Sequence, residues 1–253
     1  MNAIQYSVIN DLQIQYGKSF ALSAKIQSGD KVLDMGCGTG ELTSFLAETT
    51  GIKEGLVVGV DPDVERIKVA IQKHSGTQEN IVFQPGDSSS QFPHFNEQYY
   101  DIHFSNFVFQ WLNDEEKQIF AQTAFKCLRP GGKIAIQSQE DDADIVKKAV
   151  DLFFEDKEKA KPQVPVYYVK KSDAEALLRK SGFVVVTSEY YQRSYTFPSA
   201  DEFFSFFCAS DYYDATSISS ISKTKFFDQI VNPDKTVTVF APNVYQIIAE
   251  KMS

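Results

Sequence analysis

The strongest chemical signal in the chain is a glycine-rich segment at residues 32–40, which reads Val-Leu-Asp-Met-Gly-Cys-Gly-Thr-Gly. Glycines at alternate positions let the backbone turn sharply, and they let a ligand lie directly against the main chain, where a Cβ would collide. The segment follows a short apolar run and precedes an amphipathic one. It therefore predicts either a ligand-binding turn between a strand and a helix, or a turn that only packs the helix on the strand.

The spacing of these glycines disfavours a dinucleotide. A nicotinamide-dinucleotide site needs the pattern G-x-G-x-x-G, with the pyrophosphate at the helix N-terminus. Counted from Gly36 the third position is Glu41, and counted from Gly38 it is Thr43. Glu41 would place a carboxylate beside the phosphates, so NAD is not expected here.

Polar residues also follow the next strands of the expected sheet. Asp61 comes 21 residues after Gly40, at the end of the second strand, where a carboxylate can accept hydrogen bonds from a ribose diol. Asp87 and Ser88 follow the third strand, and Asn106 stands at the exit of the fourth. A ligand with a ribose and no phosphate would suit this set.

The pattern D-x-G-x-G-x-G resembles the first motif of the class I S-adenosylmethionine-dependent methyltransferases. Residues 100–106 and 128–133 look like that family's fourth strand and its turn into the fifth, so the resemblance covers residues 31–138 closely. It implies S-adenosylmethionine as cofactor, whose cationic sulfonium tolerates nearby carboxylates. The residues it assigns to the cofactor are Asp34, Gly36, Cys37, Gly38, Gly40, Asp61, Pro62, Asp87, Ser88 and Asn106.

Within this superfamily, residues 10–13 and 109–112 resemble the juvenile hormone acid methyltransferases and, more distantly, the trans-aconitate methyltransferases. The resemblance implies that Gln13 and Trp111 hold a substrate carboxylate through an amide and an indole N–H. The chain departs from those enzymes at Gln110, where histidine is common. Without the resemblance, Trp111 could equally be a core aromatic and Gln13 part of a solvated helix face.

The resemblance favours an acceptor carboxylate on an apolar body, such as a juvenile hormone acid or farnesoic acid. A carboxylate is anionic at neutral pH and needs no general base, whereas an amine must first lose a proton. N-methylation of a small amine, and C- or O-methylation of a quinone-like ring, remain alternatives. Two further alternatives are a nucleic-acid methyltransferase and a ligand-binding protein without catalysis.

Residues 190–213 contain ten aromatics in 24 positions, where average composition predicts about three. The phenylalanines could pack against the sheet or line a pocket for an apolar chain. The tyrosines, with Asp211 and Asp214, could instead surround an ammonium group through cation–π contacts. We expect residues 191–243 to form an inserted cap over the acceptor site.

The remaining pattern predicts an α/β fold with a doubly wound, seven-stranded, mostly parallel sheet and an aromatic-rich helical cap. Strands and helices alternate through residues 31–137, which implies parallel βαβ units, and Asn113 with Glu116 forms a capping box for a helix ending near residue 128. We expect one methyltransferase domain over residues 1–253, with residues 31–138 as its cofactor-binding half. The expected elements are strands at 31–35, 56–60, 81–83, 100–105, 133–137, 183–190 and 244–251, and helices at 41–48, 64–73, 114–128, 141–159 and 172–181.

Composition narrows the partners to a small-molecule acceptor. The chain has 25 Lys and Arg against 34 Asp and Glu, a net charge of −9, which disfavours nucleic acid. The three cysteines lack zinc-like spacing, so no metal is expected and a reducing, cytoplasmic location is favoured. We expect no signal peptide and no membrane span, while the oligomeric state stays open.

Overall fold

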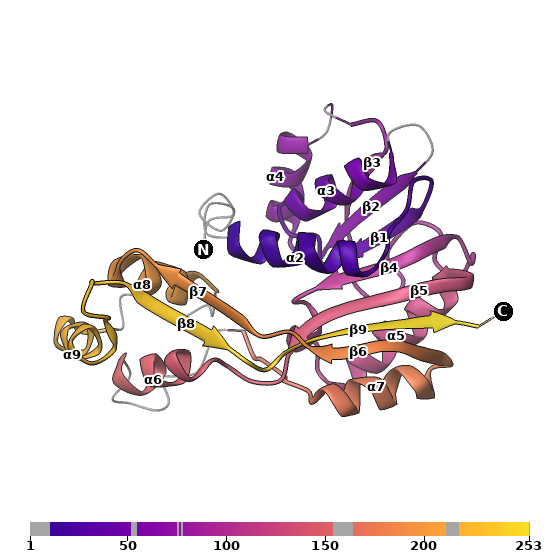
Figure 1. The fold of residues 1–253 in the computed structure, drawn as a ribbon. Coiled ribbons are helices and arrows are strands. Elements are labelled where there is room, and N and C mark those ends of the chain that lie inside the picture. Colours follow the sequence, from indigo (N-terminus) through magenta and orange to yellow (C-terminus); the bar gives the residue numbers. More distant parts are fainter. Residues whose placement is uncertain are drawn as a thin grey trace.

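The computed structural model describes residues 11–51, 55–74, 76, 78–153, 164–210 and 218–252, without the side chains of residues 11–13, 209 and 210. A seven-stranded sheet forms the centre of the molecule (Figure 1). This confirms the predicted fold class. In their order across the sheet, the strands are β3 (Ile81–Pro85), β2 (Leu56–Asp61), β1 (Lys31–Met35), β4 (Tyr100–Asn106), β5 (Leu128–Gln139), β9 (Val244–Lys251) and β6 (Phe183–Tyr190).

The strand order reverses between β1 and β4. Strands β1 to β5 are mutually parallel, and β9 runs antiparallel to both β5 and β6. From β1 the chain proceeds outward through β2 and β3, then returns to β4 on the other side of β1. In such sheets the carboxyl ends of the two central strands leave a crevice where ligands bind.

Helices cover both faces of the sheet, and alternation along β1 shows why. Val32 packs in the hydrophobic cluster of α2, α3 and α4, which contains Phe20. Leu33, its neighbour, packs in the cluster of α5 and α7, which contains Phe120, because successive strand residues point to opposite faces. The helices are α2 (Asp11–Ser23), α3 (Glu41–Thr50), α4 (Val64–His74), α5 (Asp114–Cys127) and α7 (Lys171–Lys180).

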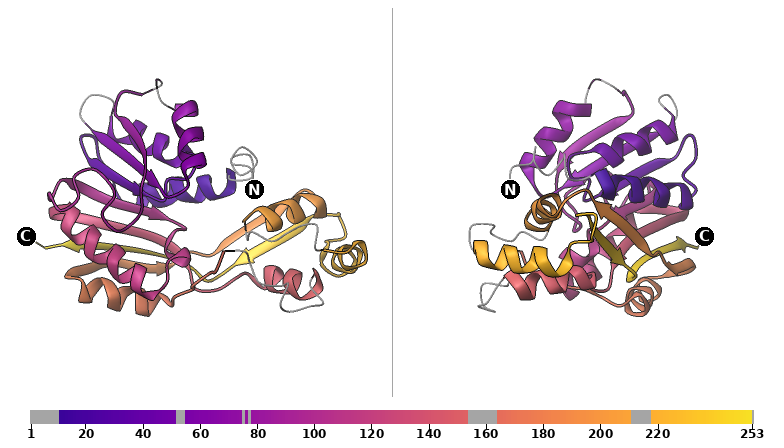
Figure 2. Two further views of the ribbon diagram at one scale, coloured as in Figure 1. Left: turned by 180° about the vertical axis from the view of Figure 1, so that it is seen from behind. Right: turned by 60° about the vertical axis from the view of Figure 1, so that its left-hand side comes forward.

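A second layer of structure extends beyond the carboxyl ends of the strands (Figures 1 and 2). The edge strand β6 leads into β7 (Arg193–Phe197), and β8 (Val237–Ala241) leads into β9, the neighbour of β6. Together β7 and β8 form a separate two-stranded antiparallel sheet. Between β7 and β8 lie α8 (Ala200–Ser210) and α9 (Ser220–Ile230), and α6 (Asp144–Phe153) packs against α9. We call α6 together with residues 193–241 the cap.

The cap has a hydrophobic core of its own. Phe203 stacks on Phe226 with ring centroids 5.3 Å apart, and Phe153 of α6 packs edge-on against Phe207 at the same distance. These four rings are buried. The interpretation that the phenylalanines of this segment pack against the large sheet is therefore wrong, because they pack against one another and α6.

Two local expectations need correction. The helix expected at 141–159 begins only at Asp144 and is described to Phe153, since residues 154–163 lie outside the described part. The segment 129–132, expected to be a turn, opens β5 as an irregular start, with Gly131 at φ +77°. The Asn113 capping box is confirmed, since the Asn113 side chain accepts from the Glu116 backbone N–H at 3.0 Å.

Candidate functional site

A cavity of about 640 Å³ opens at the carboxyl ends of β1, β2 and β4, where the strand order reverses. Its size is within the range of small-molecule and cofactor sites. Eight of the twelve residues proposed from sequence line it. They are Gly36, Gly38, Asp61, Pro62, Asp87, Ser88, Asn106 and Trp111.

The glycine-rich turn needs its glycines for two different reasons. Gly36, Gly38 and Gly40 all have positive φ, at +80°, +58° and +88°. A Cβ at Gly36 would stand 2.1 Å from Cγ2 of Val108, another residue of the cavity wall, so only glycine keeps this side open. Gly40 is the N-cap of α3, and a Cβ there would meet the Phe83 ring at 2.7 Å, which is a packing constraint.

Asp61 joins the ends of β1 and β2. Its two oxygens accept the backbone N–H groups of Gly38 and Asp63, each at 2.9 Å. The side chain is buried and burial raises its pKa, yet it still lines the cavity. Because each carboxylate oxygen has a second acceptor site, Asp61 can brace the turn and still accept a ligand hydroxyl.

Asp34 and Cys37 lie behind the turn and not in the cavity wall. Asp34 is fully enclosed and accepts a hydrogen bond from the Thr43 hydroxyl at 2.7 Å, and burial raises its pKa to about 7. Burial likewise raises the pKa of the Cys37 thiol. With Gly40, these residues shape the turn, and a direct cofactor contact from any of them stays a prediction.

The far side of the cavity is held by polar side chains in fixed positions. Asp87 accepts the Ser89 backbone N–H at 2.8 Å. The Asn106 carbonyl oxygen accepts from Gln137 at 2.7 Å, and Gln137 in turn accepts from Gln246 at 2.6 Å. This chain of amides ties Asn106 to β5 and β9, so the amide at the switch point is oriented before any ligand binds.

A second, smaller cavity of about 70 Å³ lies between the sheet edge and the cap. Trp111, in a short 3₁₀ helix (Phe109–Trp111), lines both cavities, and so do Gln110 and Phe107. Gln110 is buried and its side-chain oxygen accepts the Ser138 hydroxyl at 2.8 Å. Gln13 belongs to the first turn of α2, and its side chain lies outside the described part of the chain.

Two residues of this junction were missed by the sequence reasoning. Phe107, buried just after β4, has φ +57°, a conformation that sequence does not reveal for a phenylalanine and that concentrates at functional sites. Arg193 of β7 is buried in the wall of the smaller cavity. Its position inside an aromatic-rich segment was the available signal, since arginine stacks on aromatic rings.

The tyrosine cage expected for an ammonium is not formed by the described residues. Tyr195 lines the smaller cavity, whereas Tyr190 is 52% exposed and donates its hydroxyl to Glu140. Tyr212, Tyr213, Asp211 and Asp214 lie outside the described residues. Within the described part of the chain, no cluster of three or more His, Cys, Asp or Glu could hold a metal ion, and no helix is long and apolar enough to cross a membrane.

The larger cavity fits a nucleoside ligand without phosphate. Its walls combine bare backbone at Gly36 and Gly38 with the carboxylates of Asp61 and Asp87. This donor and acceptor set suits ribose hydroxyls, an adenine amino group and a cationic sulfonium. Fold and cavity together define a class I methyltransferase architecture.

Comparison with known proteins agrees with a methyltransferase architecture. Residues 32–132 match the family described as the methyltransferase domain. Phosphoethanolamine N-methyltransferase 1 of Arabidopsis thaliana is 31% identical over 119 residues, which cover 47% of this chain and 23% of that protein. Demethylmenaquinone methyltransferase of Lactobacillus johnsonii is 29% identical over 160 residues, covering 60% of this chain and 64% of that protein. The chain thus matches under a quarter of the plant relative's length.

Solved structures share the fold across the whole chain. A methyltransferase from Aquifex aeolicus described as S-adenosylmethionine-dependent superposes with a TM-score of 0.59 at 14% identity, with 100% of both chains covered. The YcgJ protein from Bacillus subtilis gives 0.63 at 15% identity, with 94% and 99% covered. Residues 32–132 therefore match a methyltransferase domain, and the chain shares its fold with a solved S-adenosylmethionine-dependent methyltransferase. Both matches support the predicted class of enzyme and its cofactor.

Proposed function

We propose that this protein transfers a methyl group from S-adenosylmethionine to a small-molecule acceptor bound between the sheet edge and the cap. The observation that carries the proposal is the sharing of Phe107, Gln110 and Trp111 by the two cavities. A cofactor in the larger cavity and an acceptor entering from the cap side would meet at these residues. The cap would exclude water from the reacting groups, which favours an in-line displacement.

The residues of the larger cavity have distinct proposed roles toward the cofactor. The backbone at Gly36 and Gly38 would lie against its amino-acid portion, Asp61 would accept the ribose hydroxyls, and Asp87 would face the adenine amino group. When bound, the cofactor supplies a methyl carbon already activated by the sulfonium. The chain's own task is then to align the acceptor and keep water out.

We favour a carboxylate as the acceptor group, held by Trp111 and Gln13, on an apolar body of the juvenile hormone acid or farnesoic acid kind. A carboxylate needs no base, so the absence of a catalytic triad from the sequence is no obstacle. An apolar body would lie along Phe107, Ile119 and Val164 of the larger cavity. Of the cap phenylalanines, Phe206 lines the smaller cavity, whereas Phe203, Phe207 and Phe226 are packed in the core of the cap.

An amine or a quinone-like ring is the alternative acceptor. Asp63, Asp87 and Glu116 line the larger cavity, and a carboxylate there could accept the proton that an ammonium must lose. The names of the two curated relatives, a phosphoethanolamine N-methyltransferase and a demethylmenaquinone methyltransferase, are consistent with this alternative.

The deciding experiment is a methyl-transfer assay with S-adenosylmethionine labelled in its methyl group, against panels of carboxylic acids, amines and quinols. Alkali releases the label from a methyl ester as methanol, but leaves N- and C-methyl products intact. Alkali-labile product would support the carboxylate, and alkali-stable product would replace it with the alternative. No binding of the cofactor in calorimetry would contradict the proposed function itself.

Asp61→Ala should weaken cofactor binding by about 2–3 kcal/mol, because hydrogen bonds to a charged acceptor are among the stronger ones. It should also lower the free energy of unfolding by about 1–2 kcal/mol, since the Gly38 and Asp63 N–H groups lose their acceptor. The matched control is Glu65→Ala on α4, which removes an exposed pairing with Lys68. Unchanged calorimetric affinity in Asp61→Ala would remove Asp61 from the site.

A further inference from the structure

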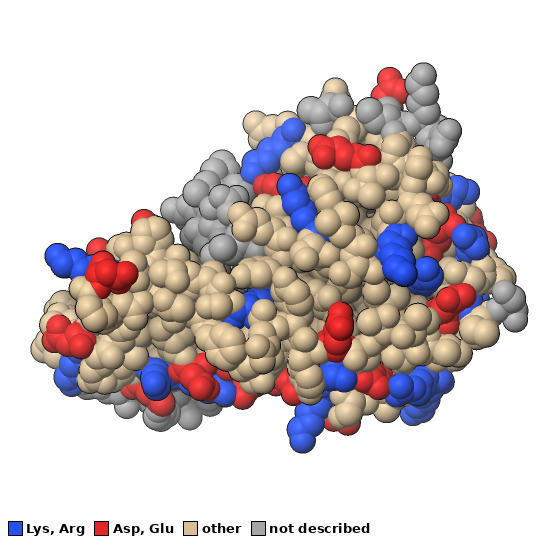
Figure 3. Space-filling view, in the orientation of Figure 1, with Lys and Arg blue, Asp and Glu red and all other residues tan. Residues whose placement is uncertain are grey.

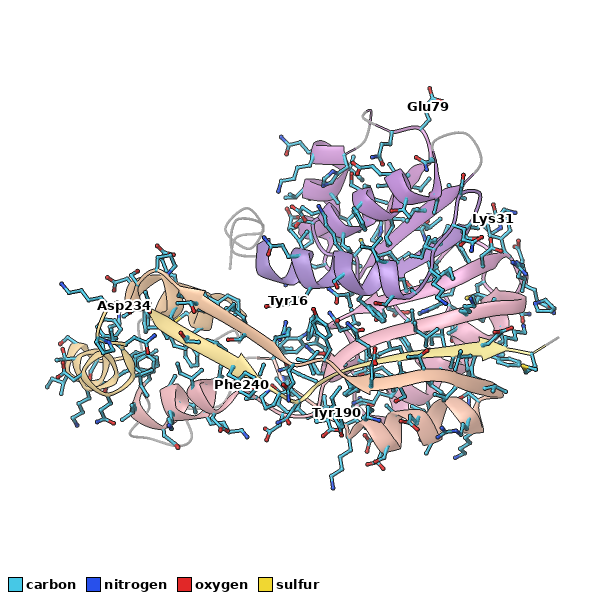
Figure 4. The ribbon with its side chains drawn as sticks, in the orientation of Figure 1. Tyr16, Lys31, Glu79, Tyr190, Asp234 and Phe240 are labelled. Atoms are coloured by element: carbon cyan, nitrogen blue, oxygen red, sulfur yellow. The ribbon has the colours of Figure 1, made fainter. Side chains whose placement is uncertain are left out.

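Arg193 is a buried arginine at the point where the cap leaves the main sheet. It is the first residue of β7, is 8% exposed, and lines the smaller cavity. Its guanidinium carbon lies 4.4 Å from the centre of the Phe107 ring and 5.3 Å from that of Tyr16. Tyr16 projects from α2 toward this ribbon (Figure 4), and its hydroxyl donates to the Ser194 carbonyl at 3.1 Å.

The hydrogen-bonding capacity of this guanidinium is largely unused. Among the described residues it makes one long hydrogen bond, from Nη2 to Oε1 of Gln139 at 3.5 Å, and Nε is buried without a partner. Among the described residues, Arg193 takes part in no ion pair. A buried charge without a counter-ion is costly, and burial accordingly lowers the pKa of Arg193.

The carboxylate that lines the same cavity has another partner. Asp142 also lines the smaller cavity, but its Oδ1 accepts the hydroxyl of Tyr168, which also accepts from Gln139 at 3.2 Å. Gln139 therefore stands between the arginine and the Tyr168–Asp142 pair as a neutral spacer. The ring contacts hold the guanidinium in place, and its in-plane N–H groups remain for a ligand.

We infer that Arg193 binds an oxyanion of the acceptor, a carboxylate or a phosphate group, in the smaller cavity. The planar fork of an arginine matches both groups with two parallel hydrogen bonds. A volume of about 70 Å³ has room for such a group but not for a whole cofactor. The inference deepens the proposed function and rests on it for the identity of the ligand as acceptor.

This assignment separates the two ends of the acceptor. A guanidinium withdraws electron density from the oxygen it binds, so an anion on Arg193 is a binding handle and a poor methyl acceptor. The reacting group would lie on the other side of Trp111, toward the larger cavity. The acceptor would thus carry an anionic end in addition to the atom that receives the methyl group. An acid with a single carboxylate lacks this second group, so the inference favours an acceptor with two anionic groups, or an anionic amine or ring, over one of the farnesoic acid kind.

The test uses Trp111, the chain's only tryptophan, as a fluorescent reporter in the wall of the same cavity. The intact chain is titrated with inorganic phosphate and, separately, with hexanoate, with sodium chloride holding the ionic strength constant. The variants are Arg193→Met, which keeps length without charge, and Arg193→Lys, which keeps charge without the fork. Arg179→Met on α7, an arginine with a 54% exposed side chain, is the matched control.

We expect saturable binding in the wild type and in Arg179→Met, and at least about tenfold weaker binding in Arg193→Met. The anion affinity of Arg193→Lys should lie between those of the wild type and Arg193→Met. Tighter binding of phosphate than of hexanoate would indicate a phosphorylated acceptor, and tighter binding of hexanoate would indicate an acceptor with a carboxylate. Removing an unpaired buried charge should leave the melting temperature unchanged or raise it.

Three results would overturn the inference: no saturable binding to the wild type, equal binding to Arg193→Met, or a lowered melting temperature in both Arg193 variants, which would indicate a purely structural residue. Calorimetry with S-adenosylmethionine separates this failure from failure of the proposed function. Cofactor binding in the wild type with no Arg193-dependent anion binding refutes only the role of Arg193. Anion binding without cofactor binding refutes the proposed function instead.

Discussion

The cofactor side and the cap side of this molecule are built in different ways. At the glycine-rich turn, one continuous segment provides the binding surface, and its backbone takes positive φ at Gly36, Gly38 and Gly40. At the cap junction, the wall comes from side chains of distant segments, among them Phe107, Gln139 and Arg193. A surface made of backbone can serve the same ligand in many proteins, whereas a surface made of side chains can change with each acceptor.

The surface in Figure 3 does not show this contrast. On the face drawn there, lysines and arginines are interspersed with acidic residues over both halves, so no single-sign field distinguishes them. The difference lies in the interior, where Asp34 is enclosed behind the turn and Arg193 is enclosed at the cap. Variants of each half should therefore have separable effects.

The largest effect is expected from Phe226→Ala in the cap. Phe226 is fully buried and contacts Phe203 and Phe153. The void left by removing its ring should therefore cost about 3–5 kcal/mol of unfolding free energy. Acceptor turnover should fall while cofactor affinity, measured by calorimetry, stays near the wild-type value. Phe240→Ala, a residue 49% exposed on β8, is the control and should change stability by about 0.5 kcal/mol or less. Equal loss of cofactor affinity would show that the halves are not separable.

Gly36→Ala tests the other half. The new Cβ would overlap Val108 and sit at φ +80°, which together should cost roughly 3 kcal/mol of unfolding free energy and most of the cofactor affinity. Gly76→Ala is the control, because φ is +95° but no atom lies within 4 Å of its Cβ, leaving about 1 kcal/mol of backbone strain. If Gly36→Ala and Gly76→Ala lost similar unfolding free energy in urea, glycine at position 36 would be required only for its positive φ.

Asp34→Asn should change how stability depends on pH. Burial raises the pKa of Asp34 from 3.8 to about 7, so folding takes up a proton between these values. The stability it contributes is full below about pH 4 and is lost as pH rises through 7. The unfolding free energy of Asp34→Asn relative to wild type should therefore rise by roughly 3–4 kcal/mol from about pH 4 to pH 8.

A second buried group makes this experiment informative. Burial lowers the pKa of His103 from 6.5 to about 3, so its stability contribution is lost as pH falls below about 6.5, opposite in sign to that of Asp34. The wild-type profile should consequently be shallow in this window. Asp228→Asn, at an exposed position of α9, is the control. A wild-type-like profile in Asp34→Asn would mean that Asp34 is ionised in the folded protein.

Trp111→Phe should have the smallest and most selective effect. Loss of the indole N–H should raise the acceptor KM by about tenfold, equivalent to about 1.4 kcal/mol, and leave cofactor affinity nearly intact. Steady-state kinetics on the acceptor identified by the methyl-transfer assay would measure it. A variant that loses fold stability, with KM unchanged for the folded fraction, would favour Trp111 as a core aromatic.

Local sequence was sufficient for much of the large sheet and the helices that cover it. The strand at 31–35 has the expected bounds, the Asn113 capping box is present, and the strands at 183–190 and 244–251 begin and end as expected. Each of these features depends on apolar alternation, capping or turn residues within a few positions. Such patterns are readable because the interactions that produce them are local.

The arrangement of the cap could not be predicted from local sequence patterns. Three features depend on contacts between distant segments. The β7–β8 ribbon extends from β6 and β9, α6 packs in the core of the cap, and Gln110 accepts a hydrogen bond from the Ser138 hydroxyl. The periodicity of apolar residues does not predict contacts between residues that are tens of positions apart. The positive φ of Phe107 is likewise imposed by its surroundings.

By itself, the sequence determined the sheet, the glycine-rich turn and the class of cofactor, because these are set by the order of residue types along short segments. Only the tertiary structure decided which proposed residues reach the cavity wall and which, like Asp34, stay behind it. It also decided that the Tyr16 and Phe107 rings both contact Arg193, which lines the smaller cavity. Burial and charge pairing depend on all packed neighbours at once, and those neighbours come from the whole chain.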